Sequence, residues 1–334
     1  MAQIPDPINS IAALIDQSHE DRPSKPRPHM GASLLGHHCD RWLWLNFRWA
    51  IQEQFPGRVL RLFRRGHKEE DWVISDLRAI GVHVYDTQRS VVFGCHVSGS
   101  LDGVVKNVPI APKSTAILEI KTHSKKSFDD LVKHGVEKSK YQHFVQMNVY
   151  MHGTSINRAL YYAVCKDDDR VYTEWLHYDK AIAEKYIKRG KTLVLEERLP
   201  PPVSTDPSWF KCKFCAAHAF CHEKKPVKHA NCRTCSHVTP KENGTFFCEK
   251  WGDAIPVEHQ YDGCDHHLLH PDLVPWEFEG SEDGLHVTWI INDKRILNGP
   301  DGYKSREIVT NPDACGDDFV EAAKDAFPGA EVVS

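Results

Sequence analysis

The sequence predicts an α/β protein followed by a smaller cysteine-rich domain, and three observations support this fold class. Up to about residue 200, runs rich in β-branched residues and broken by glycine alternate with helical patterns. The proline-rich stretch LPPPVSTDP then ends this region, and cysteine, histidine and aromatic residues become frequent. At 334 residues the chain has room for about two domains that each bury a core. We therefore divide it into an N-terminal helix and linker (1–30), an α/β domain (31–225) and a C-terminal domain (226–334).

Local signals predict each element in chain order. A short amphipathic helix at 8–18 precedes a proline-rich linker, and a second helix with a large apolar face runs from residue 33 through RWLWLNFRWA. A third helix at 59–80 ends at Gly81, because glycine readily adopts the left-handed conformation that stops a helix. The remaining elements are strands at 82–86, 89–94, 97–105 and 116–121, helices at 127–135 and 138–152, strands at 159–165 and 170–178, a helix at 180–197, and a hairpin at 285–297.

Composition and charge restrict the classes of protein that fit. Hydrophobic residues make up 41% of the chain and charged residues 26%, which is typical of a soluble globular protein. No apolar run approaches the roughly 20 residues of a membrane span, and the start MAQIPDPINS lacks the pattern of a secretory signal. We therefore expect a cytosolic protein that does not contact a membrane. The net charge of −4 argues against a protein that nucleic acid coats over its whole surface.

One helix nevertheless carries a concentrated group of basic residues, in RVLRLFRRGHK. Its basic stripe consists of Arg58, Arg61, Arg65 and Lys68. Their spacing places them along one helical face, since it follows the period of an α-helix. The stripe is either an ordinary solvated face or a surface that follows the phosphates of a nucleic acid.

The stretch STAILEIKT contains the most informative charged pattern. On a strand, Glu119 and Lys121 share one face, and a buried carboxylate and ammonium are costly unless they pair or bind something. Upstream, Asp102 lies where a strand meets a glycine. If the two strands are neighbours, Asp102, Glu119 and the backbone carbonyl of Ile120 could hold one Mg²⁺ or Mn²⁺, which prefer oxygen ligands. Such a site would hydrolyse phosphodiesters, with Lys121 orienting the water or the phosphate; a salt-bridged strand rim is the alternative.

Two helices supply further candidate residues. Gln146 and Tyr150 lie four positions apart, so an α-helix presents both on one face. Glu70 and His67 lie within the basic helix, from which a carboxylate or an imidazole could reach the same centre.

The eleven cysteines include two close-set groups. In a reducing cytosol, close-set cysteines are metal ligands more often than disulfide partners. The run KCKFCAAHAFC contributes Cys212, Cys215 and Cys221, which is one ligand short of a usual zinc or iron–sulfur site. The second group has the pattern of a structural zinc site: Cys232, Cys235, Cys248 and Cys264. Nearby histidines are alternative ligands for that zinc: His237, His259, His266, His267 and His270.

The order of the charged and polar candidates resembles the RecB-like form of the PD-(D/E)XK nuclease superfamily. The resemblance rests on Glu70 on a helix, then Asp102, then E-I-K at 119–121, then Q-x-x-x-Y from Gln146 to Tyr150. It implies a mixed central sheet flanked by helices and a DNA nuclease that depends on Mg²⁺ or Mn²⁺. Family members of the helicase-linked kind often use a histidine at the first motif, and here we favour Glu70 over His67.

The cysteines resemble those of the iron–sulfur branch, which includes AddB-type helicase-nucleases and CRISPR-associated RecB-like exonucleases. In that branch one cysteine precedes the nuclease core and three follow it, and Cys39 in HHCDRWLWL occupies the upstream place. The resemblance, over roughly residues 31–223, implies a [4Fe–4S] cluster that joins the two ends of the nuclease domain. A zinc site is the alternative, with these nearby histidines as possible ligands: His37, His38, His218 and His222.

The resemblance implies an exonuclease that acts on DNA ends or single strands in recombination, repair or replication, in a bacterium or a phage-infected cell. Recombination or replication proteins are its expected partners besides DNA. A non-catalytic nucleic-acid-binding or assembly protein that keeps the fold is the alternative. A zinc-stabilised transcription regulator ranks last, because the C-terminal region is acidic at EFEGSED and GDDFVEAAKD.

Overall fold

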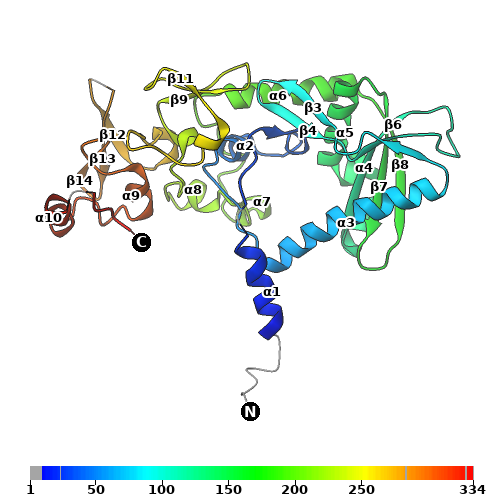
Figure 1. Cartoon of the computed structure of the whole chain (residues 1–334), viewed down its shortest axis with the longest axis horizontal. Helices are drawn as coiled ribbons and strands as arrows, with labels where there is room; N and C mark the ends of the chain where they lie inside the picture. The colour runs from blue at the N-terminus through cyan, green and yellow to red at the C-terminus, as the bar shows by residue number, and fades with distance from the viewer. Residues whose placement is uncertain (1–9, 23, 283, 328, 334) are drawn as a thin grey trace, which may run out of the picture.

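The structure, a computed structural model, describes residues 10–22, 24–282, 284–327 and 329–333. The first two residues of the predicted helix 8–18, and residue 23 of the predicted linker, therefore lie outside the described residues. The chain forms a mixed α/β fold, as predicted (Figure 1). Its helices are α1 Ser10–Glu20, α2 Asp40–Phe47, α3 Gly57–Ala79, α4 Lys125–Ser139, α5 Tyr141–Thr154, α6 Lys180–Leu195, α7 Phe210–Lys213, α8 His218–His222, α9 Ser305–Thr310 and α10 Asp318–Ala326. No described helix is both long and apolar enough to cross a membrane.

A five-stranded mixed sheet forms the centre of the α/β region. Its strand order is β2 (His83–Tyr85), β5 (Gly103–Lys106), β6 (Ala116–His123), β7 (Arg158–Cys165) and β8 (Val171–His177). The two central strands, β6 and β7, are parallel, and the other pairs are antiparallel. Parallel strands are buried on both faces, which explains the nearly continuous apolar run of β7 and makes the charged residues of β6 exceptional.

Helices cover both faces of this sheet. On one face, Val73 and Leu77 of α3 pack with Leu118 and Ile120 of β6. On the other face, α4 and α5 pack against the alternate residues of β6 and β7. Glu119 and Lys121 alternate with Leu118 and Ile120, so both charged residues lie on the α4–α5 face.

The strand predicted at 97–105 is wrong as a single element. The structure divides it into β4 (Val97–Ser100), which lies between β1 (Met30–Gly31) and β3 (Ser90–Gly94), and β5 of the main sheet. Leu101 still exchanges backbone hydrogen bonds with the segment before β3, whereas Gly103 pairs with Leu118 of β6. The chain therefore passes from one sheet to the other at Leu101 and Asp102.

The helix predicted from residue 33 through RWLWLNFRWA is also divided. The structure has a short 3₁₀ helix, η1 (Ala32–Leu34), and then α2, with a turn between them. The turn is imposed by packing, because a Cβ on Gly36 would lie 2.8 Å from the Cα of Gln142 in α5. It places Cys39 at the start of α2, where its sulfur accepts a hydrogen bond from the backbone N–H of Trp42 at 3.4 Å.

The C-terminal region contains two small sheets. The first consists of β9 (Val238–Pro240), β10 (Phe246–Cys248) and β11 (Asp253–Ile255), and its Val238 and Phe246 belong to the same apolar core as α2. The second consists of β12 (Glu277–Gly280), β13 (Val287–Ile291) and β14 (Lys294–Asn298), with its own core beside α9. Figure 1 shows this second sheet at the opposite end of the molecule from the five-stranded sheet. The domain division at residue 226 remains a prediction, while the core continues across it.

Short 3₁₀ turns connect the C-terminal strands: η2 Cys232–Thr234, η3 Val257–His259 and η4 Pro271–Leu273. The predicted hairpin at 285–297 is confirmed by β13 and β14. Its turn residues, Asn292 and Asp293, both have positive φ, at 49° and 64°. Two positive φ values match the twist of a two-residue hairpin, and Asn and Asp tolerate them better than most residues.

Candidate active site

The structure brings Asp102, Glu119 and Lys121 together where β5 begins beside β6. The Asp102 Oδ2 accepts a hydrogen bond of 2.7 Å from the backbone N–H of Ile120, in the place where the β5–β6 ladder ends. The Lys121 Nζ forms an ion pair with Glu119 and lies 3.9 Å from the Asp102 Oδ2. The same ammonium donates a hydrogen bond of 3.1 Å to the carbonyl oxygen of Ile120. Three oxygen donors from two strands thus surround one lysine.

Glu70 of α3 belongs to the same electrostatic group. The carboxyl groups of Glu70 and Asp102 influence each other, and burial followed by Asp102 raises the pKa of Glu70. Its Oε2 accepts a hydrogen bond of 3.3 Å from Gln88. His67 is exposed one turn earlier on α3, and its positive charge acts to lower the pKa of Glu70. Of the two first-motif candidates, Glu70 is the more buried and the one that interacts with Asp102 and Glu119.

Burial dominates the electrostatics of this group. Glu119 is 1% exposed, and burial, with smaller effects of Asp102 and Glu70, raises its pKa to about 7 although Lys121 acts to lower it. Burial acts to lower the pKa of Lys121, but the carboxylates of Glu119, Asp102 and Glu70 outweigh it and raise that pKa. Lys121 therefore stays charged at neutral pH, whereas Glu119 changes charge near it.

Gln146 and Tyr150 share one face of α5, as their spacing predicts, and the charges of Glu119 and Asp102 act on Tyr150. Both are buried, and Gln146 acts to lower the pKa of the Tyr150 hydroxyl. Burial, followed by the charges of Glu119 and Asp102, raises the pKa of the Tyr150 hydroxyl. That hydroxyl lies close to Gly99 of β4, where a Cβ would be only 2.4 Å from it. Glycine at this position makes the space into which the phenol extends.

A buried hydrogen-bonded network beside the site was not predicted from the sequence. The Tyr161 hydroxyl lies 2.9 Å from His123 Nε2 and 2.9 Å from His143 Nδ1, and His123 Nδ1 lies 3.2 Å from Ser127 Oγ. Tyr161 is the register partner of Glu119 on β7. Burial, followed by the charge of Lys121, lowers the pKa of His143 to about 3, so this imidazole is neutral. The alternation of Glu119, Lys121 and His123 on one strand face is the only sequence signal of this network.

We expect Tyr161→Phe to destabilise the protein by about 1–3 kcal/mol, because it leaves ring nitrogens of His123 and His143 without their hydroxyl partner. Urea unfolding of the variant and the wild-type protein measures the change. Tyr172→Phe is a matched control, since its half-buried hydroxyl bonds to Glu174, outside this network. Equal losses in the two variants would contradict a special contribution of the network.

The donors at the site suit a divalent cation. Asp102, Glu119 and the Ile120 carbonyl are hard oxygen donors of the kind that Mg²⁺ and Mn²⁺ prefer. Burial, and to a smaller extent the charge of Asp102, raises the pKa values of Glu70 and Glu119, and a bound cation would offset both effects. Within the described ranges, no group of three or more His, Cys, Asp or Glu side chains is arranged to hold a metal ion. The fit therefore rests on two carboxylates and one backbone carbonyl.

The four cysteines of the predicted iron–sulfur set surround one hollow between α2, α7 and α8: Cys39, Cys212, Cys215 and Cys221. Burial, followed by the neighbouring cysteines, raises the pKa of the Cys215 thiol to about 11. The Arg41 guanidinium lies 3.9 Å from the Cys221 sulfur and acts to lower the pKa of that thiol. His38 and His218 also line the hollow, so the mixed zinc alternative stays open.

The four cysteines of the second set also surround one hollow, beside β10: Cys232, Cys235, Cys248 and Cys264. Burial is the main cause that raises the pKa of Cys232 to about 11, and Cys264 and Cys248 add to it. His237, His259 and His266 line the same hollow, as alternative ligands would. Each set therefore lines one hollow, but among the described residues neither set is arranged to hold a metal ion, so their metal content remains a prediction.

The basic stripe lies along α3. All four of its residues line a shallow hollow of about 420 Å³ together with Arg64 and Trp72. Arg61 pairs with Asp16 of α1, and Lys68 lies 3.3 Å from Asp71. Two of the four charges are thus partly neutralised within the chain.

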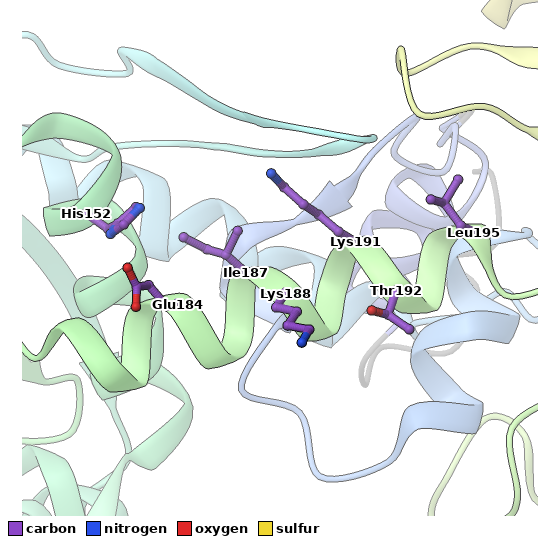
Figure 2. A pocket seen from close by; sticks show the side chains of 7 residues that line it. All are labelled: His152, Glu184, Ile187, Lys188, Lys191, Thr192 and Leu195. Carbon is purple, nitrogen blue, oxygen red and sulfur yellow. The ribbon is translucent and has the colours of Figure 1, made fainter.

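A separate hollow of about 310 Å³ follows α6 (Figure 2). Figure 2 shows His152 of α5 close to Glu184 at one end of it and Leu195 at the other end. The His152 ring nitrogen lies 2.7 Å from the Tyr178 hydroxyl. None of the predicted site residues lines this hollow, so it is not part of the candidate active site.

No protein-family model matches the chain, and no curated protein matches it. Among solved structures, a protein named SSO0001 is similar with a TM-score of 0.40 and 12% identity, over 63% of this chain and 96% of that protein. An alkaline exonuclease from Laribacter hongkongensis, LHK-Exo, has a TM-score of 0.38 and 16% identity, over 51% of this chain and 87% of the exonuclease. LHK-Exo in complex with dAMP has a TM-score of 0.37 and 15% identity, over 54% of this chain and 90% of that chain. These likenesses are distant and cover part of the chain.

Proposed function

We propose that the chain is a metal-dependent DNA nuclease of the RecB-like PD-(D/E)XK type. The observation that carries this proposal is the placement of Asp102, Glu119 and Lys121 around the backbone of Ile120, at the junction of β5 and β6. Glu70 joins the group from a third element. A salt-bridged strand rim accounts for the pair of Glu119 and Lys121, but it does not account for Asp102 and Glu70 beside that pair.

Each residue of the group has a proposed role in hydrolysis. Asp102, Glu119 and the Ile120 carbonyl hold Mg²⁺ or Mn²⁺, which when bound stabilises negative charge on the phosphate and lowers the pKa of a bound water. Lys121 orients the attacking water or the scissile phosphate through its ammonium. Gln146 and Tyr150 brace the site or contact the substrate from α5.

The basic stripe is the proposed path of the DNA backbone along α3. Arg58 and Arg65 have exposed side chains that can reach phosphates, and Arg61 can exchange its contact with Asp16 for one with DNA. Counterion release makes such contacts strongly dependent on salt. The proposed substrates are DNA ends or single strands in recombination, repair or replication, with recombination or replication proteins as further partners.

The two cysteine sets are proposed to hold structural metals. A [4Fe–4S] cluster on Cys39, Cys212, Cys215 and Cys221 would join the start and the end of the nuclease domain. A zinc ion on the second set would stabilise the C-terminal domain. Anaerobic purification followed by iron, sulfide and zinc analysis tests both assignments. Stoichiometric zinc at both sites, without iron, would contradict the assignment of an iron–sulfur cluster.

Cleavage of end-labelled single-stranded and duplex DNA by anaerobically purified protein tests the proposed function. We expect degradation with Mn²⁺ or Mg²⁺ and none with EDTA. The product ladder shows whether cutting starts at an end. If the cluster-loaded protein binds DNA but does not cut it under any of these conditions, the nuclease proposal is wrong. The alternative, a non-catalytic nucleic-acid-binding protein, then takes its place.

A further inference from the structure

A group of aromatic and lysine side chains lies on and next to α7, beside the first cysteine set, and all of them except the half-buried Trp209 are exposed. We name it the α7 platform, which consists of Trp209, Phe210, Lys211, Lys213 and Phe214. The Phe210 side chain is 66% exposed and that of Phe214 is 84% exposed. Neighbouring aromatic rings that face solvent indicate a binding surface more strongly than single exposed residues do.

The geometry of α7 presents the rings outward together. Phe210 and Phe214 lie four positions apart, which places their side chains on one side of the helical turn. Cys212, halfway between them, is buried on the opposite side. The turn at 210–214 therefore directs the Cys212 side chain inward and the rings of Phe210 and Phe214 outward.

Each ring of the platform is accompanied by a cation. The Lys211 Nζ lies 5.6 Å from the Trp209 ring centroid and 5.8 Å from that of Phe210. The Lys213 Nζ lies 5.6 Å from the Phe214 ring centroid. In the part of the chain that the structure describes, neither lysine forms an ion pair with a carboxylate. Asp206, three positions before Trp209, accepts hydrogen bonds from the backbone N–H and the hydroxyl of Ser208.

This combination fits one class of partner. Protein–protein interfaces are depleted in lysine at their centres, so alternating rings and unpaired ammonium groups favour a polyanion over a protein surface. Single-stranded DNA supplies both complements, because its bases have exposed flat faces and its phosphates are charged. In a duplex each base face is covered by the neighbouring base pair, so the aromatic rings of the platform cannot stack on it.

We infer that the α7 platform binds a single DNA strand, with bases stacked on Phe210, Phe214 and Trp209 and phosphates paired with Lys211 and Lys213. The inference names the substrate form of the proposed nuclease and rests on that function for the identity of the polymer. Stacking uses the face of a base and not its hydrogen-bonding edge, so the binding is independent of sequence.

Fluorescence anisotropy with labelled oligothymidylate, without added Mg²⁺ or Mn²⁺ and without a chelator, tests the platform on the full, metal-loaded chain. The double variant Phe210→Leu/Phe214→Leu keeps apolar side chains and removes both rings. We expect about tenfold weaker binding for each ring removed and no change for duplex DNA. Lys211→Ala with Lys213→Ala is expected to reduce the slope of log affinity against log salt by about 1.4.

Phe319→Leu is the matched control, since this ring is 81% exposed but lies beside the acidic residues Asp317 and Asp318. The platform proposal is overturned if Phe210→Leu/Phe214→Leu binds oligothymidylate with unchanged affinity. It is also overturned if Phe319→Leu loses as much affinity as that double variant. Duplex-end cleavage measured in parallel decides the nuclease proposal separately. If both rings are needed for binding of the oligonucleotide but the protein never cuts DNA, the platform proposal stands and the nuclease proposal fails.

Discussion

Lys121→Met is expected to lower the rate of DNA cleavage by about 10²–10³-fold, the usual cost of removing one preorganised charge at a reacting phosphate or carbonyl. The ammonium of Lys121 contacts Glu119, the Ile120 carbonyl and, at 3.9 Å, Asp102. It is therefore fixed before substrate binds. Single-turnover cleavage of end-labelled DNA at saturating Mg²⁺ measures the chemical step separately from binding, and DNA affinity should change by no more than about twofold.

Two further variants test whether the loss of activity in Lys121→Met comes from the candidate active site. Glu119→Gln keeps the shape of the side chain and removes its charge, so we expect the loss of activity to be relieved in part by higher Mn²⁺. Lys133→Met removes an exposed lysine of α4 and should leave the rate unchanged. If Lys121→Met cleaves DNA at a rate close to that of Lys133→Met, catalysis takes place elsewhere in the molecule. The charges of Asp102, Glu119 and Lys121 would then be only a salt-bridged rim of the sheet.

At limiting Mg²⁺, cleavage is expected to increase as the pH rises through about 7. Burial is the main cause that raises the pKa of Glu119 to about 7, so below that pH a proton occupies this carboxylate. Only the ionised carboxylate can hold a cation, so metal and proton compete for it. Saturating Mg²⁺ should therefore move the midpoint of the pH–rate profile to lower pH. A midpoint that does not depend on metal concentration would contradict this competition.

The sequence predicts the long regular elements because their signals are local. The helix expected at 59–80 is α3, Gly57–Ala79, since an amphipathic period and a terminal glycine define its length. The passage of the chain from β4 to β5 is not local. Alternation of apolar residues cannot say that Leu101 pairs with one sheet and Gly103 with another. Yet this passage gives Asp102 its position.

The candidate site divides in the same way. Glu119 and Lys121 are adjacent on a strand and stand out as charges in an apolar run. The network of His123, Tyr161 and His143 joins β6, β7 and α5, and nothing in the neighbourhood of any one of these residues indicates the other two. Such networks become visible only when the register of the parallel strands is known, because Tyr161 reaches the site as the partner of Glu119.

Arg233 is the residue with the largest expected effect on stability. It lies between Cys232 and Cys235 in η2 and is 1% exposed. Its guanidinium donates hydrogen bonds to the carbonyl oxygens of Phe47 at 3.0 Å and Pro28 at 2.9 Å. It also lies 3.6 Å from the centroid of the Trp49 ring. One side chain thus connects the C-terminal cysteine loop to the segment that contains α2.

Burial lowers the pKa of Arg233 to about 9, and no carboxylate pairs with it among the described residues. The charge is instead held by carbonyl oxygens, by Gln260 Oε1 at 2.9 Å and by the faces of aromatic rings. Truncation to alanine removes all of these contacts, leaves buried carbonyl oxygens without donors and opens a cavity.

We therefore expect Arg233→Ala to lower the free energy of unfolding by about 3–5 kcal/mol. Arg233→Met should lose less, because it fills the space and leaves only the polar groups unpaired. Arg198→Met is the control, since Arg198 is 80% exposed and its two hydrogen bonds to Asp272 are at the surface, where they contribute less to stability than buried ones. Guanidinium unfolding and release of zinc to a chromogenic chelator, measured on the same samples, separate two outcomes. If Arg233→Ala loses stability but keeps its zinc, the arginine joins the two regions without supporting the metal loop. If it is as stable as Arg198→Met, the contacts of Arg233 do not hold the C-terminal region to α2.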